Sequence, residues 1–366
     1  MQRFSSFRDF DWPLLGLLTI LSVISVLEIR SATAMTKFHG FDHKQIQFLL
    51  IGVVLMFVIS LIDYHSLLDI SPYAYGGSIV ALVAVKVVGT KVLGARRWIK
   101  LPGGIHFQPS EWVKLVLIIA VARFFWARAG RELTWKDILK AFVLVGVPLL
   151  LVLSQPDLGT SLTYTPILLA GLFLGGISFR QAAILAVAFA VLGTVVIKSG
   201  RVLKPYQVAR LTSFINPDND PKGSGYQIRQ SKIAVGSGGI WGKGTNQGTQ
   251  TQGDFLPIPY TDFIFAALSE EHGFIGAVGV LLLYFLILMR LIQNAQTAKD
   301  LPGSMIIMGI VSVIVFQIAV NVGMVVGLMP VTGIPLPLLS YGGSSVLFTF
   351  LSLGIVMNIR MRRFVN

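Results

Sequence analysis

The 366-residue sequence is 54% hydrophobic and only 13% charged, with a mean hydropathy of +0.74, which excludes a set of ordinary soluble domains. The formal net charge of +13 favours anionic partners, but no nucleic-acid module accompanies it, so acidic lipid headgroups or a phosphorylated substrate are favoured and nucleic acid is not. The absence of cysteine excludes disulfides and thiolate metal sites.

The first apolar run, residues 12–29, is followed by Ala32-Thr33-Ala34, which resembles a signal-peptidase site. We predict a retained membrane-spanning helix instead, because the run is long enough to cross a bilayer and many similar runs follow. Stretches of this kind occur at 12–29, 45–62, 71–88, 111–127, 138–155, 159–176, 181–197, 272–292, 304–325 and 342–359. The sequence therefore predicts an all-α, polytopic membrane protein with about ten transmembrane helices, in a single domain over residues 1–366.

An even number of helices places both termini on the same side of the membrane. The side that carries the termini would then also carry most short-loop cations: Arg3, Arg8, Arg128, Arg131, Lys136, Arg180, Arg290, Lys299, Arg360, Arg362 and Arg363. Because short cytoplasmic loops are enriched in Lys and Arg, we predict a multi-pass protein of the cytoplasmic (inner) membrane with both termini in the cytoplasm.

Two basic segments fall on the opposite, outer side. The 89–110 connection contains Lys91, Arg96, Arg97 and Lys100. A large extracytoplasmic loop, about 198–262 between helices 7 and 8, contains Lys198, Arg201, Lys204, Arg210, Lys222, Arg229, Lys232 and Lys243. Long loops cross the membrane whatever their charge, so the longer loop admits either interpretation, whereas the shorter one favours an anionic ligand. Apolar residues scattered through the long loop predict partial ordering against the membrane.

The most distinctive polar residues open helices at the outer face. Glu111 and Lys114 begin the fourth helix, Asp157 the sixth and Asp262 the eighth, and Ser340 precedes the tenth. These residues also suit helix caps or an i,i+3 pair, so a purely structural role stays open. Ionisable groups at helix ends inside a bundle are nevertheless costly, which favours a functional site. Asp262 has the strongest case, because it ends the loop that carries eight cations.

Other polar residues give weaker signals. Gln317 and Asn321 lie i,i+4 on the ninth helix, where interhelical hydrogen bonding is the more common explanation. Glu270 and Glu271 lie deeper in the eighth segment, and His272-Gly273 indicates a break there. The chain has no complete P-loop, HExxH, histidine cluster or Gly-x-Ser-x-Gly elbow, so neither ATP use nor a transition-metal site is predicted.

Several of these residues belong to motifs that run in order along the chain. The motifs are Gly94-Ala95-Arg96-Arg97-Trp98-Ile99, Phe107-Gln108-Pro109-Ser110-Glu111-x-x-Lys114, Gln155-Pro156-Asp157-Leu158-Gly159-Thr160, Gly225-Tyr226-Gln227 with Gln230-Ser231, Thr261-Asp262-Phe263-Ile264-Phe265-Ala266, and Leu336-Pro337-x-x-Ser340-Tyr341-Gly342-Gly343-Ser344-Ser345. Together they resemble the SEDS family (shape, elongation, division and sporulation). The glycine pattern between Gly236 and Gln250 is more similar to the elongation branch of that family than to its division branch.

The resemblance implies a peptidoglycan glycosyltransferase. Such enzymes polymerise lipid II into β-1,4 glycan strands outside the cytoplasmic membrane, release undecaprenyl diphosphate, and work with a class B penicillin-binding protein (a transpeptidase) and the elongation machinery. The family's essential aspartate falls on Asp262, and its conserved Glu and Lys of the fourth helix fall on Glu111 and Lys114.

On this interpretation Asp262 is the general base of an inverting transfer that needs no covalent sugar intermediate. The predicted substrate-binding residues are Glu111, Lys114, Arg96, Arg97, Asp157, Arg210, Arg229, Lys232, Lys243 and Ser340. No protein metal site is predicted, and a divalent cation, Mg²⁺ or Mn²⁺, is left open as a further balance for the diphosphate charge. The lipid tails require a cavity that also opens laterally. A lipid-linked precursor flippase or transporter and a non-catalytic scaffold of the cell-wall synthesis complex remain the alternatives.

Overall fold

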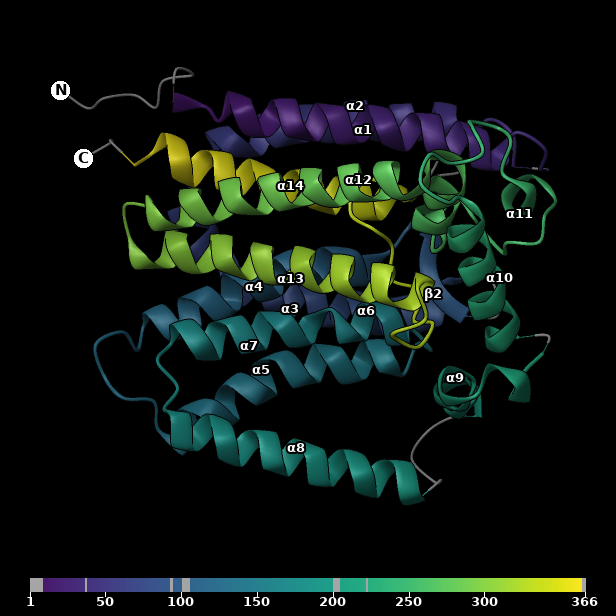
Figure 1. Cartoon of the computed structure of the whole chain (residues 1–366). Coiled ribbons are helices and arrows are strands. Elements are labelled where there is room, and N and C mark those ends of the chain that lie inside the picture. The colour runs from purple at the N-terminus through teal and green to yellow at the C-terminus, as the bar shows by residue number, and fades with distance from the viewer. Residues whose placement is uncertain are drawn as a thin grey trace.

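A computed structural model describes residues 9–36, 38–92, 95–100, 106–199, 205–221 and 223–363. In it, long helices pack side by side in one bundle, and shorter elements cover one end (Figure 1). Five cations used in the sequence argument, Arg3, Arg8, Arg201, Lys204 and Lys222, lie outside the described residues.

The bundle contains ten helical passes in the described part of the chain. They are α1 (Trp12–Thr33), α2 (Phe41–Leu61), α3 (Tyr64–Val88), α4 (Pro109–Trp126), α5 (Trp135–Leu153), α6 (Leu158–Leu162) continued by α7 (Tyr164–Leu174), α8 (Phe179–Ser199), α12 (Ile264–Gln296), α13 (Leu301–Val325) and α14 (Gly343–Met361). Among the described helices, six are long and apolar enough to cross a membrane by length and composition: α1, α2, α3, α12, α13 and α14. The prediction of an all-α, polytopic membrane protein is confirmed.

The outside of the bundle is apolar, as a lipid-facing surface must be. Leu50 and Val54 of α2 and Val187 and Leu192 of α8 are large aliphatic side chains that are more than half exposed. A soluble protein would bury most of such a surface, whereas hydrocarbon solvates it without cost. Inside the bundle, α14 is almost fully buried and packs most extensively against α2.

The start of α1 and the end of α14 lie at the same end of the bundle, opposite the short elements (Figure 1). An ion-pair network joins them. Asp11 is fully buried and accepts hydrogen bonds from Arg290 Nε at 2.9 Å and Asn294 Nδ2 at 2.8 Å, and Arg360 Nη1 lies 3.2 Å away. Since these partners come from α12 and α14, the network fastens the first and last helices together.

The connection before α4 is a small antiparallel sheet, which the sequence analysis had assigned only as a loop. Its strands are β1 (Thr90–Val92), β2 (Ala95–Lys100) and β3 (His106–Phe107), in the order β1-β2-β3. Lys91 pairs with Arg96, and Ile99 pairs with Phe107. Because side chains alternate across a strand, neighbouring residues of β2 point to opposite faces.

The long loop contains α9 (Pro205–Ile215), the 3₁₀ turn η3 (Pro217–Asn219), α10 (Ser224–Ser237) and the one-turn helix α11 (Thr249–Gln252). Its glycine-rich part docks into a break in α12. Gly273 there has φ 64° and ψ −162°, a conformation open to glycine, and the carbonyls around it are bonded by loop amides: Lys243 N donates to Glu270 O at 3.0 Å, and Gly244 N to Glu271 O at 2.9 Å. The predicted break at His272-Gly273 is confirmed.

Candidate active site

Asp262 lies in the turn that leads into α12, at the end of the bundle opposite the chain termini. Its backbone is held from two sides. Asn321 Nδ2, from α13, donates to Asp262 O at 3.0 Å and to Ile334 O at 2.8 Å, and Ser340 Oγ donates to Thr261 O at 2.7 Å. The Asp262 side chain is partly exposed. The carboxyl therefore stands on a rigid support with one side open.

Ser340 belongs to this support. Besides donating to Thr261, its hydroxyl oxygen accepts the amide of Leu336 at 2.8 Å, and the next amide, Tyr341 N, donates to Tyr260 O at 2.9 Å. The hydroxyl proton is thus already used, and the side chain is buried. Ser340 therefore positions the aspartate turn, and its hydroxyl proton is used within the chain.

Asn321 offers a direct test of how far the turn must be fixed. We expect Asn321→Leu to lower glycan polymerisation about 10- to 100-fold, because two backbone carbonyls lose their shared donor and the Asp262 turn shifts. The matched control is Gln317→Leu, one turn earlier on the same helix, whose buried Nε2 has no partner in the described structure and whose loss should cost little. Initial rates of the two purified variants make the comparison, and equal rates would contradict the positioning role of Asn321.

Three charged side chains act on Asp262. Burial raises the pKa of its carboxyl above the usual value, the cations Arg97 and Arg210 oppose this rise, and the Asp157 carboxylate adds to it. The net effect is a raised pKa, which suits a group that must accept a proton. Arg97 comes from the 89–110 connection and Arg210 from the long loop, so the structure brings one predicted cation from each basic segment to the predicted base.

Arg97 and Arg210 are both anchored by polar contacts. Arg97 Nη1, on β2, lies 3.3 Å from Asp157 Oδ1, and Arg210 Nη1, on α9, donates to Thr332 O at 3.1 Å. Both side chains remain partly exposed. Arg96 points to the other face of β2 and is exposed to solvent, so the structure does not bring it to this cluster.

Asp157 is both a helix cap, as the structural interpretation expected, and a partner of Arg97 near Asp262. It caps α6 by accepting Thr160 N at 3.2 Å, and its second oxygen accepts Gln108 Nε2 at 2.7 Å. With Arg97 as a third partner, the buried carboxylate has most of its oxygen lone pairs occupied. Asp157 therefore holds Arg97 in place beside Asp262. Sequence reasoning did not single out Gln108 by itself, although it lies inside one of the quoted motifs.

Glu111 and Lys114 form a sealed ion pair on α4. Lys114 Nζ donates to Glu111 Oε2 at 2.7 Å and lies 4.2 Å from the centre of the Phe348 ring of α14. Lys114 has no exposed surface, and Glu111 is only 4% exposed. Neither is among the charges that act on Asp262. In the described structure the pair joins α4 to α14, and Lys114 has no open face for a diphosphate.

The remaining predicted cations of the long loop lie elsewhere. Arg229 pairs with Asp218 at 3.1 Å on the surface. Lys232 lies against Gly327, just beyond the end of α13. Lys243 donates to Glu270 Oε1 at 2.7 Å, and so closes the docked loop over the α12 break. The structure therefore does not bring these three residues to the Asp262 cluster.

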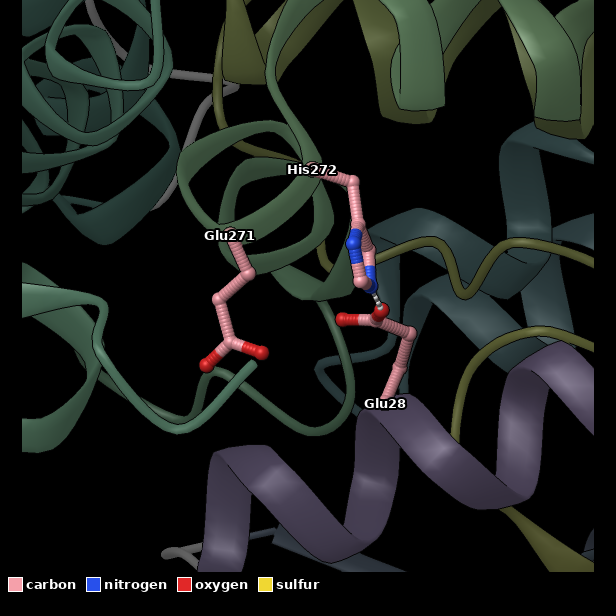
Figure 2. A group of neighbouring side chains, drawn as sticks. All are labelled: Glu28, Glu271 and His272. Carbon is pink, nitrogen blue, oxygen red and sulfur yellow. Dashed lines mark ion pairs between the residues drawn. The ribbon is translucent and has the colours of Figure 1, made fainter. Parts of the chain in front are cut away.

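A separate group of possible metal ligands was missed by the sequence analysis. Glu28 of α1 meets Glu271 and His272 of α12, as Figure 2 shows, with one ligand atom from each within 4.8 Å of the others. His272 Nε2 is 2.6 Å from Glu28 Oε1. The adjacent pair Glu271-His272 was visible in the sequence, but its partner lies more than two hundred positions away. Only the folded chain brings the three together.

The fold and the site together define a polytopic membrane protein with an aspartate and two arginines gathered at one end of its bundle, beside ordered loops. Residues 9–364 match the sequence profile of the FtsW, RodA and SpoVE family, described as cell cycle proteins. The chain belongs to this family, which is the SEDS family that the sequence motifs resemble.

Relatives and solved structures cover almost the whole chain. It is 40% identical to the peptidoglycan glycosyltransferase MrdB of Escherichia coli K12 over 96% of this chain and 94% of the relative, and 34% identical to the peptidoglycan glycosyltransferase RodA of Treponema pallidum over 99% and 100%. It is also 36% identical to a probable peptidoglycan glycosyltransferase FtsW of Coxiella burnetii over 94% and 92%.

The fold is similar to that of a chain in a peptidoglycan synthase complex that coordinates polymerization and crosslinking, with a TM-score of 0.83 and 33% identity over 98% of this chain and 99% of the other. It is also similar to the rod shape determining protein RodA of Thermus thermophilus, with a TM-score of 0.71 and 28% identity over 98% of both chains.

Proposed function

We propose that this protein is a peptidoglycan glycosyltransferase that polymerises lipid II into β-1,4 glycan strands outside the cytoplasmic membrane during cell elongation, releasing undecaprenyl diphosphate. The observation that carries the proposal is Asp262, whose turn is held at the backbone by Asn321 and Ser340 and whose carboxyl is within electrostatic reach of Arg97 and Arg210. Full-length similarity to two peptidoglycan glycosyltransferases supports the same reaction.

Asp262 acts as the general base. It takes the proton of the acceptor hydroxyl while that oxygen bonds to the anomeric carbon of the donor, and the bond from this carbon to the diphosphate breaks. Attack from the face opposite the leaving group turns an α-linked donor into a β-linked product, so one carboxylate is sufficient and no sugar becomes attached to the protein. The raised pKa of Asp262 brings its proton affinity closer to the operating pH than that of an ordinary aspartate.

Arg97 and Arg210 balance the negative charge that grows on the leaving diphosphate. Guanidinium groups bind phosphate oxygens in pairs and stay charged at every relevant pH, so they are well suited to this task. Arg97 is anchored to Asp157 and Arg210 to the Thr332 carbonyl, and these contacts hold both guanidinium groups in position. Such pre-positioned charge costs no reorganisation during the reaction.

The residues around Asp262 do not by themselves build a site for a resident metal ion. Asp157 is occupied by Arg97, Gln108 and Thr160, which leaves Asp262 as the one available carboxylate, and the described side chains that could jointly hold an ion do not include it. Mg²⁺ and Mn²⁺ prefer several oxygen ligands. The mechanism therefore assigns the diphosphate charge to the arginines, and no step uses a metal.

The polyprenyl tails stay in the bilayer, and two apolar grooves offer room for them. One of about 350 Å³ lies among α1, α2 and α14 and is lined by residues such as Leu18, Leu49 and Phe350. The other, of about 340 Å³, lies among α10, α12 and α13 beside Gly273 and is lined by residues such as Val322. The second groove borders the half of α12 that begins after Asp262, so it is the better placed for the tail of a bound substrate.

A reaction outside the cytoplasmic membrane requires one orientation of the protein in the bilayer. The end with Asp262 faces outward, and both termini, which lie at the other end, face the cytoplasm. The partner is a class B penicillin-binding protein that crosslinks the new strands, together with the elongation machinery. The similar chain from a complex that coordinates polymerization and crosslinking supports a partner of this kind.

The deciding experiment supplies lipid II to the purified, reconstituted protein with and without its transpeptidase partner. We expect glycan strands and released undecaprenyl diphosphate. Movement of lipid II across the bilayer without glycan would instead identify a flippase or transporter. Full cell-wall synthesis in cells with an Asp262→Ala chain that still binds its partner would identify a scaffold. The charges gathered at one end of the bundle favour the enzyme, since a transporter is expected to place its charged site near the midplane.

Replacing Arg97 by Gln is expected to shift the pH dependence of the reaction. Arg97 lowers the pKa of Asp262, so its replacement by Gln raises that pKa further. Because the base must be deprotonated, the acid limb of kcat/KM should move to higher pH, and activity at neutral pH should fall more than activity at alkaline pH. Arg229→Gln is the control, since its partner is surface Asp218. An acid limb that stays in place for Arg97→Gln would contradict the assignment of Asp262 as the base.

A further inference from the structure

A second charged site lies where the outer end of α1 meets the break in α12. Glu28 and Glu271 are only 2% and 1% exposed, and His272 lies beside them. Even with His272 protonated, two buried carboxylates face one cation. Burying such an excess of negative charge is costly unless a proton or a further positive charge compensates it.

One carboxylate oxygen of this group has no partner. Glu28 Oε1 contacts His272 Nε2, but Glu28 Oε2 has no hydrogen-bond partner in the described structure. In Figure 2 that oxygen points to the side on which the Glu271 carboxylate lies. Glu271 Oε2 accepts the hydroxyl of Ser31 at 2.7 Å, and the Asn246 amide also acts on this carboxylate. The free oxygen is aimed at the gap between the carboxylates, where a bound ion would bridge them.

We propose that Glu28, Glu271 and His272 form a divalent-cation site for a transition metal such as Mn²⁺ or Zn²⁺. Two carboxylates and one imidazole are ligands that these ions accept, whereas Mg²⁺ and Ca²⁺ take oxygen ligands alone. The His272 side chain is 40% exposed, which leaves an entry path and room for water ligands. Nε2, which now contacts Glu28, is the nitrogen that binds the ion.

The ion would brace the docked outer loop against the bundle. Ser31, which contacts Glu271, also accepts the amide of Asn246, and Gln252 Nε2 donates to Ser31 O at 3.0 Å. An ion held by Glu28 and Glu271 therefore ties α1, α12 and residues 246–252 together. We assign the ion a structural role. None of its three ligands is among the charges that act on Asp262, and Glu271 lies nine positions beyond Asp262 along the chain. The site is thus independent of the proposed reaction.

Metal binding itself is the test. Purified full-length protein is stripped with a chelator and titrated with Mn²⁺ while free Mn²⁺ is followed by electron paramagnetic resonance. We expect stoichiometric binding, a higher unfolding temperature with Mn²⁺, and competition by Zn²⁺ but not by Mg²⁺. Glu28→Gln, Glu271→Gln and His272→Gln should each weaken binding by at least about 10-fold, since each removes one ligand. Glu132→Gln, at an exposed glutamate outside the group, is the matched control and should bind normally.

The outcomes are distinct even if a variant folds poorly. Nitrogen coupling in the spectrum of Mn²⁺ bound to the wild-type protein reports an imidazole ligand without any substitution. The proposal is overturned if the wild-type protein binds no Mn²⁺, because the group is then only an ion pair, or if well-folded variants bind as tightly as wild type, because the ion then lies elsewhere. Both readouts are independent of glycan synthesis, so failure of the proposed function leaves them interpretable.

Discussion

Asp262→Asn is expected to lower the rate of glycan polymerisation by about 10²–10⁴-fold, because a positioned general base typically contributes that much and an amide does not accept the proton. The substitution keeps the size and shape of the side chain. The backbone contacts that fix the turn, from Asn321 and Ser340, use carbonyl groups of the main chain and therefore survive. Loss of rate then reports the carboxylate itself.

The matched control is Asp254→Asn, the same chemical change at an exposed position of the same loop, which should leave the rate unchanged. Asp262→Glu is a second variant, which retains the acid but moves it by one methylene, and it should recover only part of the rate. Initial rates with lipid II are measured for protein that elutes as a single species in detergent. Normal polymerisation by Asp262→Asn would remove the base from the mechanism and with it the enzyme proposal's central residue.

The sequence predicted the bundle because the bilayer imposes a simple length rule. A helix that crosses about 30 Å of hydrocarbon needs about 20 apolar residues, and this signal is strong in every segment on its own. The gathering of Asp157 and Asp262 at one end also followed, since it depends only on the order of the helices. The break at Gly273 could be predicted because glycine beside a polar run inside a helix is a local signal.

The two basic loops could not be predicted in the same way. The three short strands between residues 90 and 107 have too few residues to show a period, and their pairing places Arg97 at the site and Arg96 in solvent. The choice between them depends on the face of β2, which the sequence alone does not show. The Gly-rich part of the long loop likewise resembles a flexible linker until its amides pair with carbonyls freed by the α12 break.

The loop cations show the same limit in electrostatic terms. Lys243 and Arg210 have equal charge and lie in the same loop, but Lys243 is bound to Glu270 while Arg210 acts on Asp262. Net charge predicted that the outer segments favour an anion. Only the fold decides which cation is bound to a carboxylate of this chain and which acts on Asp262.

The second large effect is expected on stability, when the ion pair of Glu111 and Lys114 is broken. Glu111→Gln removes the one negative charge paired with the fully buried Lys114 ammonium and leaves it a neutral amide oxygen and the Phe348 ring, so we expect a loss of about 3–5 kcal/mol in the free energy of unfolding. Lys114→Met strands the Glu111 carboxylate in the same way. The double variant Glu111→Gln, Lys114→Met removes both charges and should be more stable than either single variant, because no uncompensated charge is then left buried.

Thermal unfolding of the four proteins in detergent measures this cycle, and polymerisation per folded molecule measures function beside it. Replacing both members of the exposed pair Arg229 and Asp218 is the control, and little change is expected there. A double variant that regains stability but makes no glycan would show that the pair also serves the reaction, contrary to its sealed position. One that regains both would show that Glu111 and Lys114 act by joining α4 to α14, so that the chemistry rests on Asp262 and the two arginines beside it.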